Sequence, residues 1–270
     1  MLKRLFPILF LIFTISCMSD IDKNITTDLQ VEGNEIFNIS FTLEESLFLG
    51  FQTLDDYRKA DTLSLPGCPN IEFNELERKI TLEFLKERDC TNDQNLERTG
   101  KIHIQYLNSN SLEATTRLTY EDYQVRGIKV EGSRDFRQVR SLTNPNRRTE
   151  VFTDLLLIDQ KESSTKISGN YEHQLTFLNG LLTGFSSTGS LEGRNITGRP
   201  IMMTPVAPKR YLINCIITGF YLPDSGSETW QIFRNQTQST THNLVYEIES
   251  ECLNRANLTL QDGRIMVFRQ

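Results

Sequence analysis

From about residue 62 onward, hydrophobic and polar residues alternate along much of the chain. The alternation is clearest over residues 79–84, 101–106, 117–120 and 243–248. A period of two is typical of antiparallel strands that turn one face to a core and the other to water. The pattern therefore predicts a chain that is mainly β.

Turn-forming dipeptides separate several of these runs. Arg126-Gly127, Asn179-Gly180 and Asp262-Gly263 each stand between two predicted strands, as hairpin turns require. They predict an antiparallel meander that forms an open barrel or a sandwich. Residues 155–158 and 212–217 are apolar on both faces, so we expect central strands there.

One helix is predicted before the strands. Thr42 followed three residues later by Glu45 has the form of a capping box. Apolar residues then recur at helical spacing, which predicts a helix over 43–60 that packs on the sheet. Residues 18–33 are polar with little periodicity, and we expect residues 17–40 to be a lipidated N-terminus and tether.

Two segments share one order of features. Each has a cysteine, an alternating strand, a second cysteine, and then a glycine-basic pair that leads into another strand. The cysteines are Cys68 and Cys90 in the first module, and Cys215 and Cys252 in the second. These local pairs predict two disulfides. Zinc binding is the competing interpretation, but neither pair has a further cysteine or histidine at ligand spacing.

The N-terminus has the features of an export signal. Lys3 and Arg4 precede an apolar run that is too short to cross a bilayer as a helix. The run ends at Ser16-Cys17, which resembles a bacterial lipobox. We expect residues 1–16 to be a signal peptide and Cys17 to carry acyl chains such as palmitate. The alternative is an ordinary secretory signal with an incidental cysteine.

Composition fits one folded, β-rich domain over 41–270. The chain is 38% hydrophobic and 24% charged, so it can bury a core, and no stretch resembles an interdomain linker. The formal net charge of −6 argues against nucleic acid as a partner, because phosphate recognition needs a basic surface.

Short motifs along the chain resemble a known group of proteins. They are Cys68-Pro69, Lys79-Ile80-Thr81, Cys90, Gly100-Lys101-Ile102, Tyr106, Tyr123, Gly127, Lys129-Val130, Glu131-Gly132, Cys215, Cys252 and Gly263. Over residues 40–270 the chain is similar to uncharacterised envelope lipoproteins of Bacteroidetes and spirochaetes. The resemblance implies export, lipid anchoring and a β-rich body, and it implies no known activity.

The sequence offers no recognisable catalytic motif. It has no Gly-x-Ser-x-Gly elbow, no phosphate-binding loop and no His-Glu-x-x-His. His103, His173 and His242 lie far apart in the chain, and we expect them on the surface. We therefore predict no catalytic residue, no metal, no cofactor and no enzymatic activity.

The most conspicuous charged feature is a short basic region. Its members are Arg134, Arg137, Arg140, Arg147 and Arg148. They suggest a patch for an anionic ligand, either envelope polysaccharide or phospholipid headgroups. The alternative is the solvated face of a hairpin, balanced by nearby acidic residues.

These observations favour a lipid-anchored protein of the bacterial cell envelope, at the outer membrane, with a surface-binding or structural role. Its partners would be the membrane and envelope polysaccharide or lipid. A second hypothesis is a carrier whose sheet holds an apolar ligand among Phe84, Tyr106, Leu118 and Phe177. A third is an envelope hydrolase, which would need two titratable groups converging in a cleft.

Overall fold

The computed structural model describes residues 21–86, 90, 96–107, 113–139 and 143–270, with the backbone alone described for residues 21–28. The predicted signal peptide, Cys17 and Arg140 lie outside the described residues.

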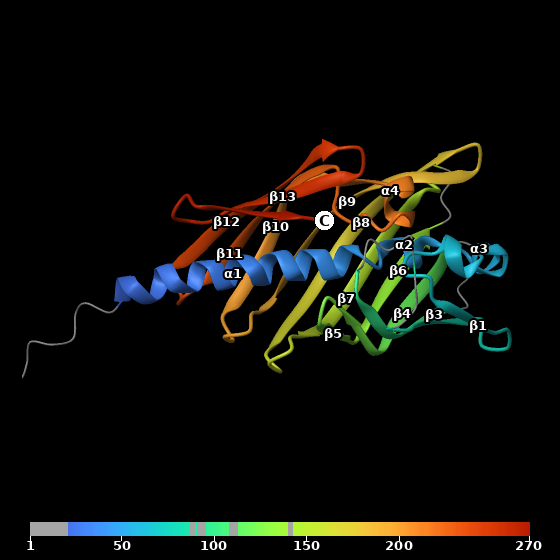
Figure 1. Cartoon of the computed structure of the whole chain (residues 1–270), viewed down its shortest axis with the longest axis horizontal. Coiled ribbons are helices and arrows are strands. Elements are labelled where there is room, and N and C mark those ends of the chain that lie inside the picture. Colours follow the sequence, from blue (N-terminus) through green and yellow to red (C-terminus); the bar gives the residue numbers. More distant parts are fainter. Residues whose placement is uncertain (1–20, 87–89, 91–95, 108–112, 140–142) are drawn as a thin grey trace, which may run out of the picture.

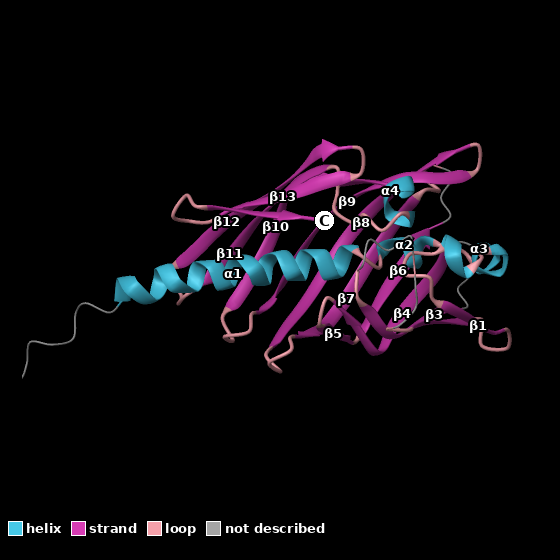
Figure 2. Ribbon diagram, in the orientation of Figure 1, coloured by secondary structure: helices cyan, strands magenta, loops and turns pink. Residues whose placement is uncertain are grey.

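In the described ranges, the strands form a single antiparallel sheet, which has 14 strands and makes up the body of the molecule (Figure 2). Neighbours in the sheet follow the chain order from β1 to β14, which are its two edges, and β5 and β6 share the place between β4 and β7. The strands are β1 Asn70–Asn74, β2 Lys79–Phe84, β3 Arg98–Leu107, β4 Glu113–Val125, β5 Ile128–Glu131, β6 Ser133–Val139, β7 Arg147–Ile158, β8 Ser164–Leu178, β9 Leu181–Arg194, β10 Pro200–Leu212, β11 Ser225–Phe233, β12 Ser239–Ser250, β13 Leu253–Thr259 and β14 Ile265–Arg269. The predicted meander is confirmed.

The sheet has a dry face and a wet face. Buried positions alternate with more exposed ones along most of its strands, as in β2, where Ile80, Leu82 and Phe84 are buried. The three predicted hairpin dipeptides join β4 to β5, β8 to β9 and β13 to β14. Alternation and turn chemistry therefore set both the pairing and the buried face.

A long helix, α1 (Ile21–Glu44), lies across the strands on the dry face (Figure 1). Phe37 stacks on Phe268 of β14 with ring centroids 4.0 Å apart, and Thr165 of β8 hydrogen-bonds to Glu35. The tether prediction is wrong for this stretch. A tether would leave its polar residues in water, whereas several polar residues of this helix pair with groups of the sheet.

The predicted helix over 43–60 is replaced by three pieces. α1 ends at Glu44, α2 spans Leu47–Phe51 and α3 spans Leu54–Lys59. A short 3-10 helix, η1, follows at Thr62–Ser64. The capping box forms at Thr53 and Asp56. Thr42 and Glu45 do not form it, because Thr42 lies inside α1 and the Glu45 carboxylate binds side chains of the sheet.

One of the two expected central strands is wrong. Residues 155–158 do lie in β7, but β10 ends at Leu212 and the next five residues form α4 (Ile213–Ile217). Cys215 and Ile216 of α4 are buried. The apolar run is therefore largely a short buried helix. Periodicity alone cannot distinguish such a helix from a buried strand.

Both predicted disulfides, Cys68–Cys90 and Cys215–Cys252, are present. The modules that contain them are not structurally equivalent. Gly263 lies in a turn, whereas Gly100 lies inside β3 at a register shift, with φ of +85°. A Cβ there would come within 2.2 Å of the Asp122 carbonyl oxygen, so this glycine serves close strand contact rather than a turn.

Candidate functional site

The dry face of the sheet holds a row of buried charges beneath α1. We call it the ionic seam, and it consists of the pairs Glu32–Arg234, Glu44–Lys209, Glu45–Arg98 and Arg134–Glu150. Burying a charge without a partner is expensive. Each pair therefore fixes its two elements against each other.

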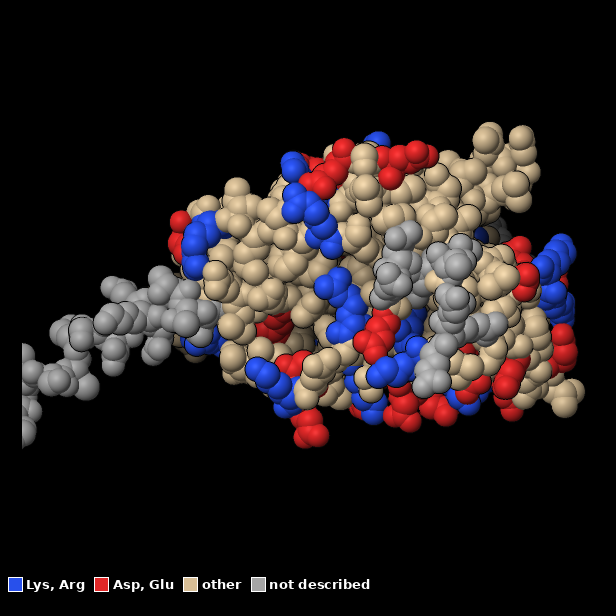
Figure 3. All heavy atoms as spheres, in the orientation of Figure 1, with Lys and Arg blue, Asp and Glu red and all other residues tan. Residues whose placement is uncertain are grey.

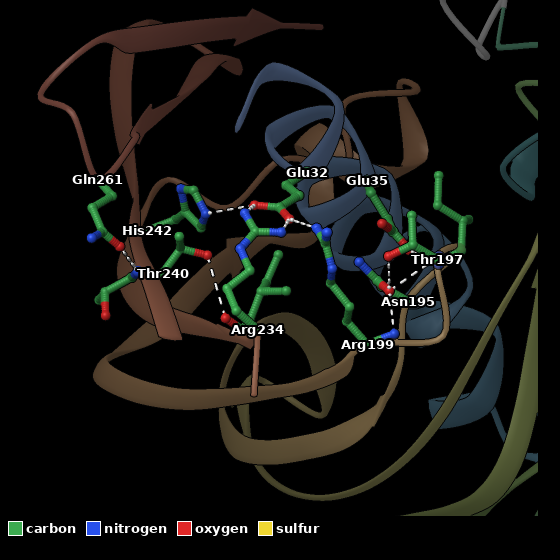
Figure 4. A network of polar contacts seen from close by, with 12 residues as sticks. Glu32, Glu35, Asn195, Thr197, Arg199, Arg234, Thr240, His242 and Gln261 are labelled. Atoms are coloured by element: carbon green, nitrogen blue, oxygen red, sulfur yellow. Dashed lines mark hydrogen bonds and ion pairs between the residues drawn. The ribbon is translucent and has the colours of Figure 1, made fainter. Parts of the chain in front are cut away.

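The seam begins near the N-terminal half of α1, at Glu32 (Figure 4). Arg234 Nη1 lies 2.5 Å from Glu32 Oε1, and Arg199 Nη1 lies 3.3 Å from the same oxygen. The Nε2 atom of the buried His242 is 3.5 Å from Glu32 Oε2. One carboxylate of the helix thus contacts a residue just before β10, a residue just after β11 and a residue of β12.

In the middle of the seam, two carboxylates share one cation. Lys209 Nζ lies 2.6 Å from Glu44 Oε1 and 2.5 Å from Glu228 Oε1. Burial would lower the pKa of Lys209, but the two carboxylates outweigh it and raise that pKa. Burial and the charge of Glu228 raise the pKa of Glu44. The Trp230 indole N–H also donates to Glu228, at 3.1 Å.

Two further pairs lie beneath the end of α1. Arg98 Nε and Nη2 each donate to Glu45 Oε2 at 3.1 Å, and the Tyr123 hydroxyl donates to the same oxygen at 2.9 Å. Next to them, Arg134 Nε lies 2.6 Å from Glu150 Oε1. Tyr123 is neutral and the other four side chains carry charge. All five are buried.

Glu150 is the carboxylate of this group whose charge is most stabilised. Burial alone would raise its pKa, but the charge of Arg134 and the hydrogen bond to His173 outweigh burial and lower the pKa to about 2. His173 Nε2 lies 2.9 Å from Glu150 Oε2. Burial lowers the pKa of His173, so this ring is neutral and donates to the carboxylate at neutral pH.

The expected surface positions of the histidines are wrong for two of the three. His173 and His242 are fully buried, on the dry face of β8 and β12. His103 retains some exposure and contacts Glu121 at 2.7 Å on the wet face. An imidazole can replace an apolar side chain inside the sheet when an acidic residue is available there.

Sequence reasoning missed the seam because its helix side does not look apolar. Glu32, Ile36, Ser40 and Glu44 follow one another at a spacing of four, which places them on one side of α1. Three of the four are polar, so they form no hydrophobic stripe. Two signals were available in the sequence. The polar residues of this row recur at helical spacing, and several predicted strands carry a single cation.

The seam is structural rather than an open reaction site, since the helix covers it. A separate cavity of about 570 Å³ lies where α2 and α3 meet the ends of the strands. Aromatic side chains and cations line it, and its wall includes Phe51, Gln52, Arg58, Tyr106, Thr116, Phe136, Gln138 and Arg148. We call it the arginine cavity. Its size is in the range of small-ligand sites.

Arg148 is the distinctive charge of the arginine cavity. Its Nη1 donates to the backbone carbonyls of Pro145 and Arg147, at 2.9 and 3.0 Å. Among the described residues, no carboxylate forms an ion pair with it. Partial burial lowers the pKa of Arg148 to about 10. Arg58, by contrast, pairs with Asp55 and Glu75.

The structure does not bring the four described arginines of the predicted patch together; the fifth, Arg140, lies outside the described residues. Arg134 is buried against Glu150, Arg137 pairs with Glu113 and Arg147 pairs with Glu172. Neighbouring residues of a strand point to opposite faces, so the sequence cluster divides between both sides of the sheet. Of the four described members, only Arg148 lines the arginine cavity.

The four residues proposed to line an apolar ligand cavity also lie apart. Phe84 and Leu118 are buried in the core beneath the helices, and Tyr106 lines the arginine cavity. Phe177 lies near the β8–β9 turn and is 41% exposed. The dry face on which a ligand would have rested is covered by α1.

Comparison with family models, curated proteins and solved structures found no match. Within the described ranges, no helix has the length and apolarity needed to cross a membrane. The same residues contain no cluster of three or more His, Cys, Asp or Glu side chains that could hold a metal ion.

The seam predicts a specific pH dependence for Glu150→Gln. Replacing the carboxylate leaves Arg134 buried without a counter-ion, which should lower the free energy of unfolding at pH 7 by about 3–5 kcal/mol. Because the native pKa of Glu150 is about 2, below its ordinary value of 4.5, its contribution is present above pH 4.5 and is lost as pH falls toward 2. The difference between the two proteins should therefore shrink on acidification.

Urea denaturation of both proteins between pH 7 and pH 3 measures this difference. Glu44 and Glu45 titrate in both proteins, so the comparison isolates Glu150. Glu172→Gln is the matched control, since Glu172 pairs with Arg147 on the surface and is 45% exposed. It should cost less than about 1 kcal/mol. A Glu150→Gln effect of that small size, or one that does not vary with pH, would contradict the account.

Proposed function

We propose that this protein is a lipid-anchored protein of the bacterial cell envelope, attached to the outer membrane through Cys17, that binds an acidic polysaccharide without transforming it. Two disulfides support an oxidising compartment. The lipobox-like Ser16-Cys17 and the resemblance to envelope lipoproteins support the anchor. Helix α1 begins at Ile21, close in sequence to Cys17, so the attachment point would connect almost directly to the folded body.

The observation that carries the binding role is the charge of Arg148 in the arginine cavity. Among the described residues, the hydrogen bonds of this guanidinium go to carbonyl oxygens, and a guanidinium without a carboxylate partner favours an anion within reach. An acidic sugar supplies a carboxylate for Arg148 and hydroxyl groups for Gln52 and Gln138. Phe51 and Tyr106 give the same cavity apolar surfaces. Most of the exposed cavity lining is polar, which suits a ligand rich in hydroxyl groups.

The two alternatives have less support. An apolar carrier would need α1 to leave the dry face, and that movement would separate the buried ion pairs of the seam. A hydrolase would need titratable groups that converge on a substrate. In the arginine cavity the two acidic residues, Asp55 and Glu113, are each paired with an arginine.

The ligand proposal predicts that Arg148→Gln weakens binding of a uronic-acid oligosaccharide. Hydrogen bonds to charged groups contribute about 1.5–3 kcal/mol, so the dissociation constant should rise about tenfold or more. Isothermal titration calorimetry with hexagalacturonate measures it. Arg147→Gln is the matched control, because Arg147 points to the other face and pairs with Glu172. Equal binding by wild type and Arg148→Gln, or no binding by wild type at millimolar concentration, would refute this role.

The anchoring proposal predicts that a clickable fatty acid labels the wild-type protein in cells and does not label Cys17→Ala. The labelled protein should enter the detergent phase on phase separation, and the variant should stay in the aqueous phase. Labelling of both proteins, or of neither, would show that Cys17 is not the attachment site.

A further inference from the structure

The tip of the β8–β9 hairpin is an exposed apolar feature that neither the ionic seam nor the arginine cavity uses. The hairpin extends beyond its neighbours in the sheet (Figure 1). Asn179 and Gly180 form the turn, with φ of 52° and 80°. Around it, Phe177 is 41% exposed, Leu178 is 64% exposed and Leu181 is 72% exposed. Three large apolar side chains therefore project from a narrow turn.

Charge is absent from the whole end of this hairpin. From Gln174 to Leu191 the sequence contains no Asp, Glu, Lys or Arg. In the space-filling view the protruding upper right end has no basic or acidic atoms, whereas charged side chains are frequent elsewhere on this face (Figure 3). An exposed apolar patch marks a site that contacts a ligand, another protein or a membrane. The lack of charge at this end leaves such a contact unopposed.

We propose that the β8–β9 tip inserts into the interface of a phospholipid bilayer. Three side chains are far fewer than the roughly 20–30 residues that each partner contributes to a specific protein interface. A protruding tip also offers no concave surface to a protein partner. A bilayer adapts its shape to the tip, and an uncharged hairpin enters it without burying a charge.

The turn limits how deep the tip enters. Asn179 and Gly180 carry peptide groups that would lose their water in the hydrocarbon core. The tip therefore stays at the boundary of headgroups and acyl chains, to a depth of about 5–10 Å, as interfacial segments do. At that depth Leu178 and Leu181 contact acyl chains while the turn keeps polar partners.

The inference rests on the proposed lipid anchoring, which keeps the protein at a membrane. Helix α1 begins at one end of the long axis of the molecule and the β8–β9 tip lies toward the other end (Figure 1). A lipid near the helix start together with an inserted tip would hold the protein at two separated points. Its long axis would then lie along the bilayer.

Tryptophan fluorescence in vesicles tests the insertion. The natural Trp230 is fully buried, so it supplies a constant background. Leu178→Trp is prepared in the lipidated full chain and reconstituted in phosphatidylcholine vesicles with brominated acyl chains. We expect at least twofold quenching of the added emission, together with a shift to shorter wavelength. Val206→Trp is the matched control, because Val206 is 68% exposed on β10 away from any turn, and its emission should not be quenched.

The outcomes separate this inference from the anchoring proposal. If the protein floats with the vesicles and Leu178→Trp is not quenched, anchoring stands and the inserted tip is refuted. If the protein does not float, anchoring fails, and the tip is tested with excess vesicles. Quenching of Leu178→Trp alone would then still support insertion, and its absence would refute it. A wavelength shift without lipid that disappears on dilution would assign the tip to contact between two copies and would also refute insertion.

Discussion

Charge pairing between α1 and the dry face of the sheet is the constraint on which the rest of the structure depends. Glu32 and Glu44 of α1, and Glu45 directly after it, each lie opposite a basic residue from a different strand or strand end. Buried pairs of this kind contribute little net stability compared with apolar residues of the same shape. Breaking one is costly, however, since it leaves an unpaired charge in the core. A shift of α1 by one turn would separate all three pairs at once.

The position of α1 in turn determines the arginine cavity. The Glu45–Arg98 pair and the hydrogen bond from Arg134 to Ser46, at 2.8 Å, hold the end of α1 against β3 and β6. α2 and α3 continue from that fixed point, and Phe51 packs edge-on against Phe136 with centroids 5.7 Å apart. The wall of the cavity is thus supported by the same charges that hold the helix. A change in the seam near Ser46 should therefore also reach the ligand site.

Local chemistry was enough to predict an antiparallel meander, although not the single open sheet that it forms. Alternation set the buried residues of β2 and β3, whereas in β12 it held for Leu244 and Tyr246 but not for Ile248, which is 58% exposed. The Asn-Gly and Asp-Gly dipeptides set two of the turns, and nearby cysteines in the chain set the disulfides. These signals are local. They suffice here because strands that pair in the sheet also follow one another in the sequence. The apolar run at residues 212–217 was ambiguous for the same local reason, because a short buried helix and a buried strand share its composition.

Long-range charge pairing is the part that local patterns could not reveal. The partners Glu44 and Lys209 are far apart in the sequence, and either residue alone is typical of a surface. The same limit applies to residues that are close in the sequence, as two arginines near the candidate site show. Arg134 and Arg148 point to the dry face, yet Arg134 is neutralised by Glu150, whereas Arg148 pairs with no carboxylate in the part of the chain that the structure describes and donates to carbonyl groups. Strand alternation assigns the face, but only the fold shows which cation has a counter-ion.

The claim that buried charges hold α1 against the sheet is tested most directly by hydrogen exchange along the helix. The account predicts that the amides from Ile36 to Glu44 exchange as slowly as those of β3 and β4, because releasing them requires the ion pairs to open together. Fast exchange of these amides, while the strands stay protected, would show that the helix leaves the sheet freely and would contradict the account.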